Sequence, residues 1–106
     1  MTTPPFAISV LAAPDGVVRV RLSGDFDMSV GNALADTLVE TARRPGGTAV
    51  VVDLEQTRLI DSHAVAALVA GYQAATSARR DFTVVNGRGI VQQVLDITGL
   101  SEVLCR

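Results

Sequence analysis

The spacing of hydrophobic and polar residues at the start of the chain predicts a β-hairpin. Residues 6–12 are rich in Ile, Val and Leu, and in residues 17–22 aliphatic side chains alternate with two arginines, the period of a strand with one solvated face. Pro14-Asp15-Gly16 between them is a turn sequence, because Pro presets φ and Gly tolerates a positive φ. We therefore expect two antiparallel strands, the second ending at a polar break over residues 23–27.

Residues 28–43 have the spacing of an amphipathic helix. Aliphatic side chains recur at every fourth position between residues 30 and 38, so they share one helical face. Asp27 or Ser29 is the expected N-cap. Two arginines and then Pro45-Gly46-Gly47 end the helix.

The centre of the chain joins a buried strand to a second helix. The apolar run over residues 48–54 predicts a strand inside a sheet, and a polar loop is expected over residues 54–62. Asp61 and Ser62 are both helix-starting residues, and an apolar series at helical spacing follows them. We expect Ser62 at the first turn of this helix, where its hydroxyl can cap free backbone N–H groups and the helix dipole is positive.

The last third of the chain predicts one more strand, a helix and a short final strand. Residues 82–86 are strand-like, and the glycines of residues 87–89 turn the chain into a helix with an apolar face. Gly99 suits the position just after that helix. Residues 100–105 read as the final strand.

This order predicts an α/β fold in a single domain over residues 1–106. After the antiparallel hairpin, strands alternate with helices, which favours parallel strands and right-handed crossovers in a mixed sheet of four to five strands. The carboxyl ends of parallel strands share one edge of the sheet, where ligands commonly bind. The residues expected to form one surface there are Asp25, Asp27, Asp61, Ser62 and Asn86.

Composition narrows the functions that this domain can have. The 106 residues are 48% hydrophobic and 4% aromatic with a net charge of −2, so we expect a packed aliphatic core and no nucleic-acid partner. A single Cys fits a reducing cytoplasm, and no segment reads as a signal peptide or membrane span. One His and one Cys far apart predict no metal site, and we expect no cofactor. Asp61-Ser62-His63 is not a catalytic triad, because neighbouring helical side chains diverge by about 100°; no enzyme activity is expected.

Three stretches of the sequence resemble the signature motifs of STAS domains. Within that family, the sequence is most similar to the bacterial anti-sigma factor antagonists. These are Val-Arg-Leu-Ser-Gly-Asp-Phe-Asp at 20–27, Val-Asp-Leu at 52–54 running to Ile-Asp-Ser at 60–62, and Val-Leu-Asp-Ile-Thr-Gly-Leu at 94–100. The resemblance covers nearly the whole chain and implies a small mixed sheet flanked by helices.

The resemblance also implies a regulatory switch. In the family, the serine that matches Ser62 is phosphorylated by a partner kinase that is also an anti-sigma factor, and the phosphorylated antagonist releases that partner. The implied partner-binding residues are Asp25, Asp27, Asp61, Ser62, His63 and Asn86. Phosphorylation adds about −1.5 to −2 charges, which backbone N–H groups at the helix start are expected to accept. We expect a monomer or weak dimer.

Two positions depart from the family pattern, and they keep a second reading open. His63 and Ala64 stand where the family commonly has Ser or Thr and then Gly. In the second reading, Asp61 and Ser62 only cap the helix, Asp25 and Asp27 are solvated turn residues, and the domain is a STAS module that is never phosphorylated. Such a module would sense a ligand or belong to an assembly such as a lipid transporter.

Overall fold

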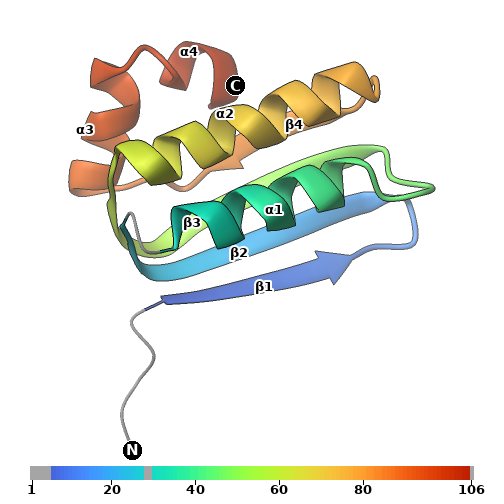
Figure 1. Ribbon diagram of the computed structural model, residues 1–106, viewed down its shortest axis with the longest axis horizontal. Helices are drawn as coiled ribbons and strands as arrows, with labels where there is room; N and C mark the ends of the chain where they lie inside the picture. Colours follow the sequence, from blue (N-terminus) through green and yellow to red (C-terminus); the bar gives the residue numbers. More distant parts are fainter. Residues whose placement is uncertain (1–5, 28–29, 106) are drawn as a thin grey trace, which may run out of the picture.

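The computed structural model describes residues 6–27 and 30–105, which form four strands and four helices (Figure 1). In chain order these are β1 (Phe6–Ala12), β2 (Val17–Phe26), α1 (Gly31–Ala42), β3 (Ala49–Ile60), α2 (Ser62–Ser77), β4 (Asp81–Val85), α3 (Gly89–Ile97) and α4 (Ser101–Leu104).

The strands form one mixed sheet in the order β1-β2-β3-β4. β1 is antiparallel to β2, whereas β2, β3 and β4 are parallel, so the predicted α/β class and strand directions are confirmed. In Figure 1, α1 and α2 lie side by side on one face of the sheet, and α3 and α4 lie at the β4 side, away from β1.

The core lies between this sheet and its helices, and it includes Val91 and Leu95 of α3 and Leu104 of α4. In β2 the aliphatic side chains are buried and the two arginines between them are exposed, as the alternation predicts. On α1, Leu34 and Leu38 are fully buried, which confirms the face inferred from their spacing. On α2 the buried residues are Leu68 and small residues that include Ala64, Ala67 and Gly71.

Gly71 allows the close approach of α1 and α2. A Cβ at this position would lie 2.9 Å from the Cβ of Leu38 and 2.9 Å from Cε2 of Phe82. Real Cβ atoms do not approach other carbon atoms that closely, so the two helices and β4 meet at a point where only glycine fits.

The strands β2 and β3 are longer than predicted, and the expected break at residues 23–27 and loop at residues 54–62 are wrong. β2 continues to Phe26, and β3 continues to Ile60. Two register shifts accompany this extension, because Arg21 pairs with Asp53 but Asp25 pairs with Leu59. The extra residues in β3 are β-bulges, which keep a polar segment hydrogen-bonded within the sheet.

The ends of two other elements also differ from the prediction. α1 begins at Gly31, and its N-cap is Val30, which makes no side-chain cap; the N–H of Val30 donates to the carbonyl of Asp27, and the alternative cap Ser29 lies outside the described residues. The final strand predicted over residues 100–105 is wrong, since Ser101–Leu104 forms the short helix α4.

Gly99, with φ of +77°, separates α3 from α4 as expected of a residue just after a helix. The N–H of Leu100 donates to the Leu95 carbonyl across this turn. The chain thus turns back and forms a second helix. The apolar residues of this segment alone do not distinguish such a short helix from a strand.

Candidate functional site

Ser62 is the first residue of α2, and the residue is exposed. This confirms the predicted start of the helix. The expected cap is wrong in one respect: the carboxylate of Asp61, not the hydroxyl of Ser62, caps the helix. Asp61 Oδ1 accepts hydrogen bonds from the N–H groups of His63 at 2.9 Å and Ala64 at 3.1 Å.

The end of β2 fixes the position of this helix start. The N–H of Asp61 donates to the carbonyl of Phe26 at 3.1 Å, so the last residues of β2 and the first of α2 are neighbours. The N-terminus of α1 closes the other side, because a Cβ on Gly31 would lie 2.8 Å from the Cβ of His63. Ser62 is therefore exposed on a rigid support formed by three elements.

A second acidic group lies on the same end of the sheet. Asp25 forms two hydrogen bonds with the Arg58 guanidinium, at 3.1 Å and 3.3 Å, between the paired strands β2 and β3. Arg58 is largely exposed, while Asp25 is about one-third exposed. Asp25 is thus a strand residue in an ion pair and not the turn residue that the sequence suggested.

Asn86 belongs to a different group of residues. It follows β4 with φ of +62°, a conformation that Asn tolerates, and its amide donates to Asp53 Oδ1 at 3.1 Å. The pairing of β3 with β4 ends at Asp53, and β3 then continues for seven more residues to Ile60. Over the same length β2 advances five residues, from Arg21 to Phe26, so at about 3.3 Å per residue the end of β3 at Ile60 lies roughly 17 Å beyond Asp53.

The expected single surface is therefore divided. Asp25, Asp61, Ser62 and His63 lie at the end of β2 and β3, and Asp27 immediately follows β2. The expected grouping of Asn86 with them does not match its place beside Asp53. The cause is the length of β3, which outruns β4 and separates the carboxyl ends of the two strands.

Asp53 is a buried charged residue that the sequence reasoning did not single out. Its side chain is 4% exposed and forms an ion pair of 2.9 Å with Arg19 on β2, and it accepts hydrogen bonds from Asn86 and from the N–H of Glu55. Burial acts to raise the pKa of Asp53, but the hydrogen bonds and the positive charge of Arg19 outweigh it and hold the pKa below its ordinary value. The feature of the sequence that could have indicated this buried ion pair is an Asp within an otherwise apolar strand.

The geometry at Ser62 suits a residue that accepts a phosphate more than a site at which backbone N–H groups bind one. Asp61 already uses two of the first N–H groups of α2, so a phosphate on Ser62 would meet a carboxylate where free donors were expected. The nearest imidazole nitrogen offers little compensation, since His63 Nδ1 lies 4.0 Å from Asp61 Oδ2 and its side chain is 53% exposed.

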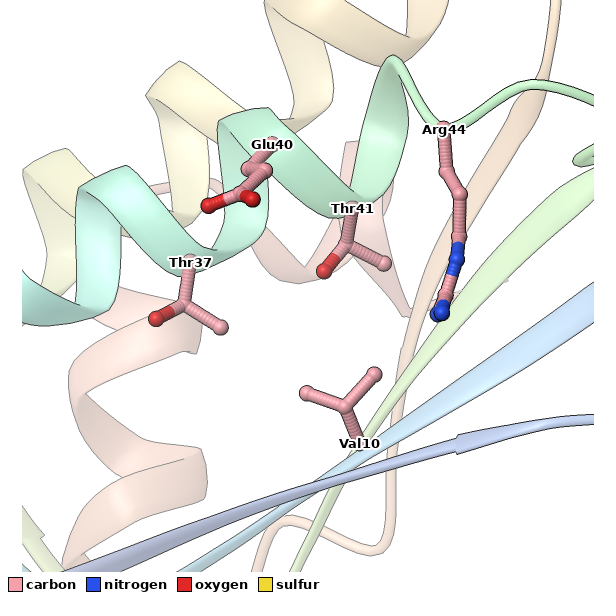
Figure 2. A pocket seen from close by; sticks show the side chains of 5 residues that line it. All are labelled: Val10, Thr37, Glu40, Thr41 and Arg44. Carbon is pink, nitrogen blue, oxygen red and sulfur yellow. The ribbon is translucent and has the colours of Figure 1, made fainter.

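A hollow of about 310 Å³ lies between β1 and α1 and is lined by Val10, Thr37, Glu40, Thr41 and Arg44 (Figure 2). Within residues 6–27 and 30–105, no three His, Cys, Asp or Glu residues are grouped as they would be to hold a metal ion. Of the described helices, none has the length and apolarity needed to cross a membrane.

Comparison with known proteins defines the class. A family model described as "Mlab, STAS domain" matches residues 9–105. The chain therefore belongs to the STAS domain family. A search among curated protein sequences gives no match.

Solved structures show the same fold at low sequence identity. The anti-sigma factor antagonist SpoIIAA in its unphosphorylated form has a TM-score of 0.81 at 16% identity, over 92% of this chain and 85% of that one; the Bacillus protein has also been solved phosphorylated. An anti-sigma factor antagonist from Mycobacterium paratuberculosis has a TM-score of 0.78 at 23% identity, over 98% and 87%. A sulfate transporter family protein from Wolinella succinogenes has a TM-score of 0.69 at 18% identity, over 89% and 75%.

Proposed function

We propose that this protein is an anti-sigma factor antagonist of the bacterial cytoplasm. It binds an anti-sigma factor that is also a serine kinase, and phosphorylation of Ser62 by that kinase releases the complex. The observation that carries the proposal is that Ser62 is an exposed serine at the first residue of α2, beside Asp61. The similarity to SpoIIAA, solved with and without its phosphate, supports it.

The switch acts through charge at a fixed surface. A phosphate on Ser62 adds about −1.5 to −2 charges next to the Asp61 carboxylate, whose Oδ1 is held by the N–H groups of α2. Because Asp61 keeps those donors, the new charge remains on the surface. A kinase that docks against this end of the sheet with acidic or apolar groups is then repelled, and about 1.4 kcal/mol of repulsion lowers its affinity tenfold.

Arg58 and Leu59 extend the docking surface beyond the serine. Leu59 is 41% exposed although it is a large apolar residue, and Arg58 is held in place by its ion pair with Asp25. An apolar side chain beside a fixed cation and an exposed hydroxyl is a combination that a specific protein partner can recognise.

The test is phosphate transfer from a cognate serine kinase of the histidine-kinase-like ATPase class, for which a gene beside this one is the first place to search. Incubation with ATP is expected to add one phosphate, and Ser62→Ala is expected to abolish it. Ser77→Ala is the matched control, because Ser77 is an exposed serine at the opposite end of the same helix. A label that survives Ser62→Ala would reject the assignment.

A second function has its own support. The matching family model and the transporter-family neighbour favour a STAS module that is never phosphorylated and serves as a subunit of a transport assembly, for instance one that moves lipids. The occupied N–H groups at the α2 start and the Ala64 side chain, where the antagonist pattern has glycine, agree with that reading. Co-purification with a transporter ATPase, together with no phosphate transfer to Ser62, would establish it over the first.

A further inference from the structure

The two edges of the sheet are protected to different degrees. At one edge, β4 contacts α4, and α3 lies on the same side. At the other edge, β1 is the outermost strand, and among the described residues no element lies beyond it (Figure 1). An outer strand presents unpaired N–H and C=O groups that can pair with another strand.

The sequence of β1 does nothing to prevent such pairing. Its seven residues, Phe-Ala-Ile-Ser-Val-Leu-Ala, contain no charged residue and no proline, which are the usual devices that block edge pairing. Val10 is 40% exposed and Leu11 is 54% exposed, so apolar side chains are accessible on both faces of the strand.

The hydrogen bonds of the hairpin show which backbone groups are available. The N–H of Ala13 donates to the Val17 carbonyl at 2.9 Å, and the register continues with Ala12 opposite Val18. Because antiparallel partners alternate between bonded and non-bonded pairs, Leu11 and Ser9 bond to β2. The N–H and C=O groups of Ile8 and Val10 therefore point away from the sheet.

The outward groups of β1 are complementary to those of a second β1. A two-fold axis beside β1 makes the two copies of this strand antiparallel. With the axis at Ser9, Ile8 of one copy lies opposite Val10 of the other, so the outward N–H groups of each strand face the outward C=O groups of its partner on both sides of the axis.

We infer that β1 is the interface of a symmetric dimer, in which the β1 strands of two copies of this chain pair antiparallel to form one continuous eight-stranded sheet. The inference is independent of the proposed function. A single seven-residue strand forms a small interface, so the dimer is weak and depends on concentration.

The first test is sedimentation equilibrium of the full chain from about 20 µM to about 1 mM, a range that includes the dissociation constants of small interfaces. The wild type is expected to change from monomer to dimer across it. Val10→Pro removes an outward N–H without removing a bond to β2 and is expected to abolish dimerisation. Val10→Thr keeps the N–H and the branched Cβ, and it is expected to dimerise like the wild type.

The second test needs no substitution and remains decisive if Val10→Pro does not fold. Amide hydrogen exchange of the wild type is expected to slow at Ile8 and Val10 as concentration rises, while Ser9 and Leu11 are protected at every concentration. A chain that stays monomeric to about 1 mM, or one that dimerises without slower exchange at Ile8 and Val10, would overturn the inference, the latter by showing another interface.

Discussion

The hydroxyl of Thr57 donates a hydrogen bond of 2.9 Å to the carbonyl of Leu22, and both residues are buried. Leu22 lies at the first register shift between β2 and β3, between the pairs Arg21–Asp53 and Ser23–Gln56. The Thr57 side chain therefore supplies a donor at the point where the regular ladder is interrupted, which allows the two strands to continue together to the Ser62 site.

Thr57→Val should destabilise the protein by about 1–3 kcal/mol, because it leaves the buried Leu22 carbonyl without its donor. Urea unfolding followed by circular dichroism measures the loss. Thr57→Ser retains the hydroxyl and is expected to recover most of the stability. Equal losses in the two variants would show that the methyl group, not the hydrogen bond, matters.

Asp53 should make stability depend on pH in the acid range. Its pKa is lower in the folded protein than its unfolded value of about 3.9, so its contribution is complete above that value and is lost as pH falls through the folded pKa. Asp53→Asn is expected to cost about 1–3 kcal/mol at neutral pH, and the difference from wild type should shrink in acid, where Asp53 is protonated. Asp36→Asn, an exposed change on α1, is the control for loss of a carboxylate and is expected to leave the free energy of unfolding at neutral pH close to that of the wild type.

Asp61→Ala should remove the cap of α2 and cost about 0.5–2 kcal/mol in unfolding free energy. Asp61→Asn keeps a capping oxygen and should lose much less. The Asn variant also separates the two roles of Asp61, because it removes the negative charge beside Ser62 while the helix start stays in place. With phosphorylated protein, partner release is expected to be weaker in Asp61→Asn than in the wild type.

Ser62→Glu should reduce binding to the partner kinase at least tenfold, equivalent to about 1.4 kcal/mol, because it places a permanent negative charge beside Asp61. Calorimetric titration of the kinase measures the change. Ser77→Glu carries the same charge at the far end of α2 and is expected to bind as the wild type does. If Ser62→Glu bound normally and remained folded, charge at this position would not be the switch.

Gly71→Ala should destabilise the protein by about 1–3 kcal/mol through overpacking against Leu38 and Phe82. Helix propensity alone favours Ala over Gly by about 1 kcal/mol, so the sign of the change is informative. Ala66→Gly, at an exposed position of the same helix, measures that propensity without the packing. A Gly71→Ala protein as stable as the wild type would mean that α1 and α2 can separate to admit the methyl group.

The sequence predicted those elements whose signals are local. The hairpin turn, the buried face of α1, the start of α2 at Ser62 and the glycine after α3 each follow from short-range propensity and spacing. The apolar segment that contains Asp53 was also predicted as a strand, although its continuation to Ile60 was not.

The errors arose where tertiary pairing overrides the local pattern. Buried positions in the second half of β3 fall at Leu54, Thr57 and Ile60, every third residue, because bulges add residues to the strand. The alternation of buried and exposed residues that indicates a strand is therefore missing there, and the sequence predicts a loop instead. That extension also separated Asn86 from Ser62, which the order of elements alone does not reveal.

The bulges of β3 also affect how partner choice can evolve. A regular strand turns every second side chain inward, whereas from Leu54 to Ile60 only every third residue is buried, which leaves Glu55, Gln56, Arg58 and Leu59 facing solvent. Four of the five positions between Leu54 and Ile60 are thus released from packing in the core. Related domains can therefore change the four exposed residues, and with them the partner that they bind, while Leu54, Thr57 and Ile60 preserve the fold.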